Sequence, residues 1–438
     1  MSARVLAMAF AATAIAAGCA HRAVAQADTM TTSFQVNGLN VILRRNTSND
    51  VVAANIYLLG GTLQLTPATQ GIELMLLRAS EYGTKRFPVD RGRQIVAQLG
   101  SVMNITPAED WTVFGFTSIR STFDSTWAVF ADRLVAPTLD SNQVEQVRAR
   151  MLTAVRAAAT SPDPIVSHLA DSLTFMAHPY GFSPEGNAAT LQSITLGQLR
   201  RYQATQMVTS RMLLVVVGNV DRSDLEQLVG RTLAQLPRGS YAWSAPHPPA
   251  PHGRALVVQD AQLPTNYILG YYVGPRATEP DYPALRLATA ILSGRFFTEI
   301  RSKRNLSYEV DAPFLDRAIA TGGVYVTTVE PNQTLQLMHI EIDRLKGELI
   351  DRSGLERLVQ QFITDYFLKN ETDADQATFL ARAQIYQGDY RAASHFVEDL
   401  RRVQPEDIRR VARAYMHDFH FVYLGKSDAL SRALIDQF

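Results

Sequence analysis

The sequence predicts an α+β protein of two similar lobes, each an antiparallel-rich β-sheet with helices packed on it. The chain of 438 residues is long for a single domain, and its 46% hydrophobic and 19% charged residues are typical of a globular protein. The order of predicted strands and helices repeats in the second half. A proline-rich stretch between the halves predicts an extended linker. We therefore expect an N-terminal lobe at 28–239, a linker at 240–254 and a C-terminal lobe at 255–438.

Residues 1–27 have the features of an export signal, with the basic Arg4 followed by an apolar run. Two processing routes are open. Ala25-Gln26-Ala27 has the small-x-small pattern of a signal-peptidase site, whereas the residues before Cys19 resemble a bacterial lipobox. Cys19 is the only cysteine, so the chain cannot form an intrachain disulfide. We expect an exported, periplasmic protein, either free or anchored to the outer membrane through a lipid on Cys19.

The charge balance argues against nucleic acid as a partner. Lys plus Arg and Asp plus Glu number 42 each, so the chain has no net positive field to attract phosphates. Beyond the export signal, no apolar run approaches the ~20 residues that a spanning helix needs. We therefore expect no nucleic-acid partner and no transmembrane segment in the mature protein, with a lipid anchor at Cys19 as one possible link to the membrane.

The predicted N-terminal lobe begins with a hairpin at 33–43, where alternating hydrophobic residues flank an Asn-Gly turn. Runs rich in β-branched and aromatic residues predict strands at 51–59, 111–119 and 213–217. Apolar residues at helical spacing predict helices at 71–84, 91–99, 121–134, 142–159 and 223–236.

The predicted C-terminal lobe has the same order of elements. Strands are expected at 255–258, 266–272, 324–329 and 421–424, and helices at 282–292, 332–345 and 427–438. The strand at 113–116 with its following helix matches the strand at 324–327 with its following helix most clearly. Each lobe is therefore expected to be one copy of the same structural unit.

One predicted helix has the outline of a zinc-peptidase helix without its ligands. An H-x-x-E-H motif places two histidines on one helix face with a general-base glutamate between them. Counted back from Gly83-Thr84, the histidine positions hold Leu74 and Arg78, and the glutamate position holds Leu77. Leucine has no lone pair to donate, and a protonated arginine repels a divalent cation. We expect no metal and no cofactor in this chain.

The duplicated lobe, the linker and the helix ending in Gly-Thr together resemble the pitrilysin, insulinase and mitochondrial processing peptidase family, over about residues 30–438. The segments 99–106, 177–181 and 295–308 resemble the family's strand-edge segment, His-Pro-x-Gly loop and Arg…Gly-Leu-x-Tyr segment. Asn305 replaces the glycine of that last segment. Asparagine also tolerates a left-handed conformation, so we expect Asn305 to adopt one.

The resemblance implies that the third zinc ligand, a glutamate, falls at Val155. No Asp or Glu occurs from 146 to 162, and no His occurs between His21 and His168, so a shifted alignment does not restore the site. The resemblance therefore implies the zinc-free subunit of a heterodimeric peptidase, with zinc in a homologous partner subunit. Such a chain takes part in hydrolysis of peptides or unfolded proteins only within the complex and is inactive alone.

The resemblance also assigns residues to that role. Arg301 and Tyr308 would complete the partner's active site by stabilising the developing oxyanion, as hydrogen-bond donors aimed at a carbonyl oxygen can do. Asn104 and Thr106 would hold a peptide along an exposed strand edge. The alternatives are that Arg301 and Tyr308 serve packing only, and that Asn104 and Thr106 are ordinary turn residues.

Two rival functions stay open at this point. The first is a non-enzymatic periplasmic peptide-binding or scaffold protein. The second is an autonomous peptidase whose metal is held by Glu73, Glu81 and distant histidines. Of the remaining histidines, His178 is expected to cap a loop, and His420, just before the last predicted strand, is expected to face solvent.

Overall fold

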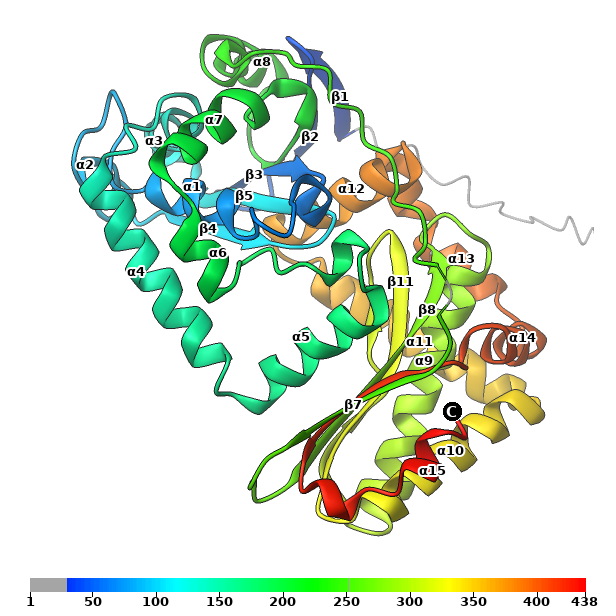
Figure 1. The fold of residues 1–438 in the computed structure, drawn as a ribbon. Coiled ribbons are helices and arrows are strands. Elements are labelled where there is room, and N and C mark those ends of the chain that lie inside the picture. The colour runs from blue at the N-terminus through cyan, green and yellow to red at the C-terminus, as the bar shows by residue number, and fades with distance from the viewer. Residues whose placement is uncertain (1–29, 251) are drawn as a thin grey trace, which may run out of the picture.

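Two lobes built around mixed β-sheets make up the protein in the computed structural model, which describes residues 30–250 and 252–438 (Figure 1). The N-terminal lobe contains strands β1 (Thr31–Val36), β2 (Leu39–Arg45), β3 (Val51–Leu59), β4 (Val102–Pro107), β5 (Trp111–Ile119) and β6 (Met212–Gly218). Its helices are α1 (Ile72–Ala79), α2 (Arg91–Gln98), α3 (Phe123–Val135), α4 (Ser141–Ala158), α5 (Pro162–Phe175), α6 (Ala188–Ser193), α7 (Leu196–Gln206) and α8 (Arg222–Arg231). The export signal and Cys19 lie outside the described residues.

The C-terminal lobe contains strands β7 (Ala255–Asp260), β8 (Asn266–Arg276), β9 (Ser307–Asp311), β10 (Phe314–Leu315), β11 (Ile319–Thr328) and β12 (His420–Gly425). Its helices are α9 (Asp281–Phe296), α10 (Pro331–Gly347), α11 (Arg352–Lys369), α12 (Asp373–Gln387), α13 (Phe396–Arg402), α14 (Pro405–Tyr415) and α15 (Arg432–Ile435). Residues 240–250, in the predicted linker, contain neither helix nor strand. None of the helices in the described parts of the chain has the length and apolar character needed to cross a membrane.

The two sheets share an order of corresponding strands, with β1 as an additional strand of the N-terminal sheet, and they confirm the predicted α+β fold. The N-terminal sheet has the order β1-β2-β6-β3-β5-β4, and the C-terminal sheet has the order β10-β11-β8-β12-β7 with β9 also paired to β11. Strands β2 and β6 are parallel, as are β7 and β12, while β3 and β8 pair antiparallel with both of their neighbours. Strand β4 therefore occupies the same edge of its sheet that β9 occupies in the other lobe.

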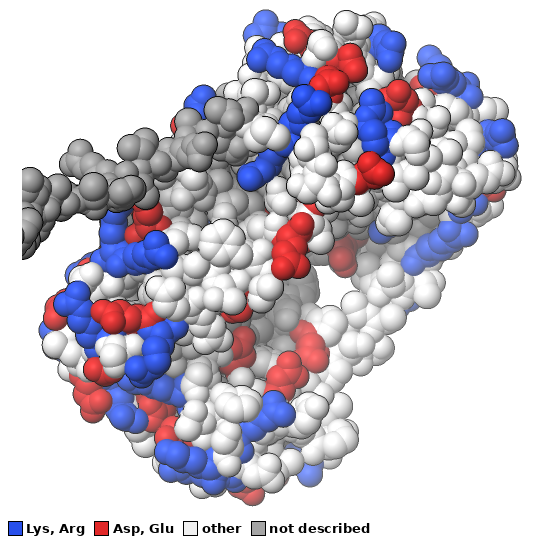
Figure 2. Space-filling view, turned by 180° about the vertical axis from the view of Figure 1, so that it is seen from behind, with Lys and Arg blue, Asp and Glu red and all other residues white. Residues whose placement is uncertain are grey.

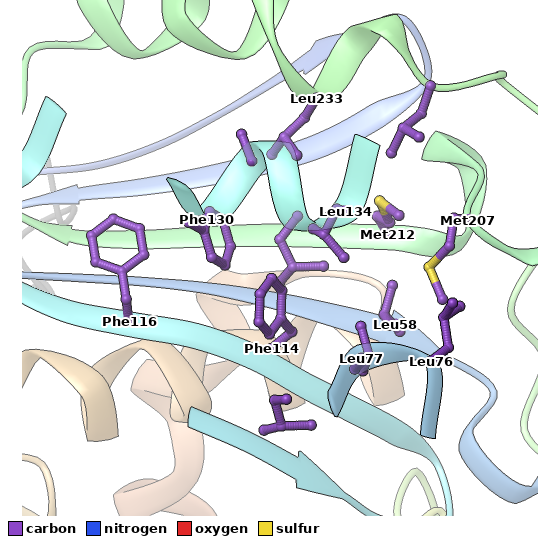
Figure 3. Close-up of a cluster of buried hydrophobic side chains, with 14 of the residues drawn as sticks. Leu58, Leu76, Leu77, Phe114, Phe116, Phe130, Leu134, Met207, Met212 and Leu233 are labelled. Atoms are coloured by element: carbon purple, nitrogen blue, oxygen red, sulfur yellow. The ribbon is translucent and has the colours of Figure 1, made fainter. Parts of the chain in front are cut away.

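The core of the N-terminal lobe lies between one face of its sheet and the helices that the same lobe contributes. Phe114 of β5 stacks on Phe130 of α3 at 4.8 Å between ring centres, and Trp127 is fully buried beside them. Figure 3 shows Leu76 and Leu77 of α1 in the same cluster as Phe114, with Leu77 near Leu58. Helix α1 is thus an integral part of the hydrophobic core.

The opposite face of each sheet is covered by a helix of the other lobe. Helix α12, from the C-terminal lobe, packs on β3 and β6 through Leu380 and Ile385. Helix α5, from the N-terminal lobe, packs on β8 and β12 through Val166 and Ala170 (Figure 1). Each of these helices is the second of a helix pair, after α4 and α11 respectively. The lobes therefore exchange equivalent helices, and each sheet is closed by the other half of the chain.

A buried carboxylate fixes the junction between the lobes. Asp110, at the start of β5, is 3% exposed and accepts hydrogen bonds from the Tyr386 hydroxyl at 2.7 Å and the Ala318 backbone N–H at 2.8 Å. The Tyr180 hydroxyl also donates to it. Burial raises the pKa of Asp110, and these three donors oppose that effect. One side chain thus connects four segments from both lobes.

Several regions differ from the sequence-based prediction, which also lacked α6, α7, α11, α13 and α14. The predicted helix at 427–438 is wrong for most of its length, because only Arg432–Ile435 is α-helical and a short 3₁₀ turn covers Ser427–Ala429. The helix predicted at 142–159 ends as expected. The difference is that Pro162 begins a further helix, α5, because proline at the first position of a helix loses no intrahelical hydrogen bond. The prediction had no α5 and no α12, the two exchanged helices.

The helix exchange predicts that a cavity in α12 weakens the other lobe. Leu380→Ala removes a side chain that is 4% exposed and should lower the free energy of unfolding by about 2–5 kcal/mol. Trp111 and Trp127 lie in the N-terminal lobe, so urea unfolding followed by tryptophan fluorescence reports on that lobe. Its midpoint should move to lower urea. The matched control Leu368→Ala, at a position that is 58% exposed, should change stability by less than about 0.5 kcal/mol. An unchanged fluorescence midpoint in Leu380→Ala would contradict the exchange.

Candidate functional site

The degenerate motif lies on helix α1, which begins after Gly71, a glycine with φ of 84°. Leu74 is 8% exposed and Leu77 is 1% exposed, and both side chains belong to the core of the lobe. Val155 of α4 is partly buried and packs against the same core, and α4 lies against α1. Leu74, Leu77 and Val155 therefore pack in or against the hydrophobic core, and their aliphatic side chains do not fit a zinc ion.

Positive charge surrounds this helix. The Arg78 side chain is 45% exposed and lies 3.7 Å from Glu81. The buried Arg133 of α3 donates to the Leu77 carbonyl at 3.1 Å and to Glu81 at 3.2 Å, and burial lowers its pKa to about 10. The Arg133 guanidinium therefore contacts the C-terminal end of α1. In an H-x-x-E-H helix this end carries the second histidine. Sequence reasoning missed Arg133, because nothing in its neighbourhood along the chain distinguishes it from a surface arginine of an amphipathic helix.

The carboxylates near the motif are already paired, which contradicts the autonomous peptidase with unusual ligands. Glu73 is 5% exposed, lies 2.6 Å from Arg211, and accepts a hydrogen bond of 2.9 Å from the Tyr202 hydroxyl. Glu81 is held by Arg133. Within residues 30–250 and 252–438, no three His, Cys, Asp or Glu side chains are grouped in a way that could hold a metal ion. Glu73 and Glu81 serve ion pairs of the fold.

Arg301 and Tyr308 lie side by side at the surface of the C-terminal lobe. The Arg301 guanidinium is 4.9 Å from the ring centre of Tyr308 and 5.3 Å from that of Phe297. Tyr308 is 81% exposed and Phe297 is 49% exposed. Among the described residues Arg301 has no carboxylate partner, and its half-buried side chain is held by two aromatic rings. Its charge and N–H donors are therefore free to meet a ligand or a partner protein.

The local chain geometry produces this arrangement. Helix α9 continues into a π-helical turn at Phe297–Ser302, a conformation that is frequent at functional sites. The chain then reverses at Asn305, whose φ of 50° confirms the left-handed conformation expected for it. Strand β9 follows and carries Tyr308 back beside Arg301. Phe297 was not identified from the sequence, because its importance depends on the π-helical register of this turn.

Asn104 and Thr106 lie on β4, the edge strand of the N-terminal sheet. Both side chains are exposed, whereas Ile105 between them is 8% exposed and belongs to the core. Within the part of the chain that the structure describes, strand β4 pairs only with β5, so its outer edge is open to an extended peptide. Because β4 and β9 occupy equivalent edges, the Asn104 segment and the Tyr308 segment are corresponding parts of the two lobes.

The histidines serve the fold. The His178 side chain accepts a hydrogen bond from the Tyr180 N–H at 3.1 Å and so caps the turn that follows, as expected. The expectation for His420 was wrong, because it is 4% exposed and stacks on His252 at 4.2 Å between ring centres. His420 is the first residue of β12 in the sheet interior, and burial lowers its pKa.

Comparison with known proteins agrees with this geometry. The profile described as "Insulinase (Peptidase family M16)" matches residues 40–185, and that described as "Peptidase M16 inactive domain" matches residues 193–362. Mitochondrial-processing peptidase subunit beta of Blastocladiella emersonii is 23% identical over 400 residues, which cover 87% of this chain and 85% of that protein.

Two solved structures have the same fold. The peptidase M16 inactive domain from Pseudomonas fluorescens superimposes with a TM-score of 0.83 at 19% identity, covering 91% of this chain and 98% of that one. The periplasmic protease PqqL of Escherichia coli superimposes with a TM-score of 0.75 at 13% identity, covering 91% of this chain but only 46% of PqqL. The two profiles, the full-length relative and the shared two-lobed fold agree, and the chain belongs to the insulinase family, peptidase family M16.

Proposed function

We propose that this chain is the zinc-free subunit of a heterodimeric peptidase and supplies Arg301 and Tyr308 to the active site of a zinc-bearing partner. The observation that carries the proposal is the contrast between its two candidate sites. The motif helix has aliphatic side chains packed in the core where zinc ligands would be. Arg301, in contrast, lies unpaired against an 81% exposed Tyr308.

The chemistry available to Arg301 and Tyr308 suits peptide hydrolysis in which another chain activates the water. A guanidinium N–H and a phenol O–H are both donors to a carbonyl oxygen, and they gain strength as that oxygen becomes negatively charged. The stacking of Arg301 between Tyr308 and Phe297 orients the guanidinium before substrate arrives, which reduces the entropic cost of binding.

The open edge of β4 supports a peptide substrate. An extended peptide can add to this edge through backbone hydrogen bonds, with Asn104 and Thr106 beside it. Such binding accepts many sequences, because backbone groups supply most of the contacts. Peptides and unfolded proteins are therefore the proposed substrates.

Two of the similar proteins support the proposal of a homologous partner subunit. One relative is named as the beta subunit of a processing peptidase, and this chain spans about half the length of PqqL. A second two-lobed chain would supply the missing half, with the zinc ligands that this chain lacks. The signal-like residues 1–27 support export to the periplasm, with Cys19 as a candidate lipid anchor.

A second candidate function, peptide binding without hydrolysis, is favoured by the same open β4 edge. It requires neither Arg301 nor a partner. The two functions are separated by Arg301→Ala, which should abolish partner-dependent cleavage in the first case and leave peptide affinity unchanged in the second.

The isolated chain is predicted to hold no zinc and to cleave no peptide. Leu74, Leu77, Arg78 and Val155 offer no donor set for the metal. Elemental analysis of the purified chain should find far less than one zinc per molecule, and a quenched peptide library should stay uncut. Addition of a zinc-bearing two-lobed homologue should restore cleavage, and a chelator should remove it. One tightly bound metal ion per isolated chain would contradict the proposal.

Tyr308→Phe is predicted to lower kcat of the complex by about tenfold to a thousandfold, because one donor to the oxyanion is lost. KM should change little, since the ring and its contact with Arg301 remain. The matched control is Arg304→Gln, an arginine of the same segment that is paired with Glu299 at 2.8 Å. The control should leave kcat within a factor of about two. Equal turnover by wild type and Tyr308→Phe would remove this residue from the reaction.

A further inference from the structure

A large cavity in the C-terminal lobe lies among segments that the proposed function does not use. Its volume is about 1030 Å³, at the upper end of the range for small-molecule sites. Helices α9, α11, α12, α13 and α14 contribute to its lining. One wall is α12, the helix that packs on the N-terminal sheet, so the cavity borders the junction between the lobes.

Two arginines share one carboxylate in this cavity. Arg286 donates to Asp316 at 2.9 Å, and Arg382 forms an ion pair with the other oxygen of Asp316. The Arg286, Asp316 and Arg382 side chains are 30%, 18% and 25% exposed, and all three line the cavity. These three side chains together have two positive charges and one negative charge, and the Asp110 carboxylate lies near Asp316 and Arg382.

Asp316 is a buried carboxylate with a second carboxylate nearby. Burial, together with the nearby Asp110 carboxylate, raises the pKa of Asp316 to about 7. Burial also lowers the pKa of Arg286 and that of Arg382. Arg286 donates a single hydrogen bond to Asp316, and Arg382 contacts Asp316 and Tyr386, so each partly exposed guanidinium keeps N–H groups that no acceptor in the described protein occupies. A second anion at this position would satisfy them.

Aromatic side chains cover the cavity near these charges. Tyr366, Phe379 and Phe396 lie with ring centres 4.7 to 5.9 Å apart, and the Arg286 guanidinium is 5.3 Å from the Phe396 ring. All three rings line the cavity. They offer an apolar surface to the body of a ligand whose charged end meets the arginines.

The surrounding charges select among anions. Acidic side chains also line the cavity, including Asp365, Asp375 and Glu279. They would repel a multiply charged phosphate more strongly than a singly charged carboxylate. A planar carboxylate also matches the geometry of a guanidinium.

We propose that this cavity is a ligand site for an organic carboxylate with an aromatic or aliphatic body, with Arg286 and Arg382 binding the carboxylate. The C-terminus of a peptide and a free aromatic acid share this chemistry. Tyr386, which also lines the cavity, donates to Asp110 at the lobe junction, so the site is connected to the contact that holds the lobes together. The proposal stands independently of the heterodimer.

The test is calorimetric titration of the purified full chain without any partner. N-acetylphenylalanine should bind, and N-acetylphenylalaninamide, which lacks the charge, should bind about tenfold or more weakly. Acetate should bind weakly, because it has no body to contact the rings. Tighter binding of N-acetylphenylalanine than of phenylpropionate assigns the site to peptide C-termini, and the reverse order assigns it to free aromatic acids. Equal affinity for the acid and the amide, or no binding of any acid, would overturn the proposal.

Two substitutions at the arginine pair should act in opposite directions. Arg286→Gln should weaken carboxylate binding about tenfold or more, and Asp316→Asn should strengthen it, because the internal competitor loses its charge. The matched control is Arg45→Gln, which removes an ion-paired arginine of the N-terminal lobe, 3.2 Å from Asp221. The control should bind as the wild type does. Thermal unfolding establishes that each variant is folded, and the comparison of acid with amide tests the site without any variant. A folded Arg286→Gln with unchanged affinity would refute the assignment.

Discussion

The exchange of α5 and α12 between the lobes is the packing interaction on which the rest of the structure depends. Each sheet has two apolar faces, and the lobe that contains it covers only one of them. The second face is buried by a helix from the other half of the chain. Neither lobe can therefore bury its own hydrophobic surface alone, and separating the lobes would expose both sheets to water. Apolar contact alone does not specify how the lobes are oriented, and the Asp110 hydrogen bonds favour one relative orientation.

The rigid junction between the lobes fixes the two candidate sites relative to each other. The β4 edge and the Arg301–Tyr308 pair belong to corresponding edges of two sheets whose relative position is fixed by exchanged helices. In a two-chain enzyme built from such units, the subunits would move relative to each other while the two lobes of one chain stay together. Separating the lobes would expose apolar surface that is now buried. On the face shown in Figure 2, Lys and Arg lie close to Asp and Glu, and the chain has 42 residues of each sign, so global electrostatics would contribute little to partner choice.

The degenerate motif on α1 shows how core side chains and ion pairs can fill the positions of an H-x-x-E-H pattern. A zinc site places polar ligands on the motif helix, and burying those groups without a metal would leave them unpaired. In this chain Leu74 and Leu77 extend the core, Glu73 is neutralised by Arg211, and Arg133 satisfies the Leu77 carbonyl. The Glu73 carboxylate is engaged through one of its two oxygens, by Arg211 and Tyr202. The helix is consequently better suited to stability than to holding a cation.

The sequence alone determined the α+β class, the repeat of the lobes, strands such as Val51–Leu59 and the loss of the zinc ligands, because these depend on local hydrophobic periodicity and on side-chain chemistry at fixed spacing. It also indicated the left-handed Asn305. Only the tertiary structure decided which sheet α5 and α12 cover, that His420 is buried, and that Arg286, Asp316 and Arg382 share a cavity. These facts depend on contacts between residues far apart in the chain, and neither hydrophobic period nor motif spacing carries information about a partner in the other lobe.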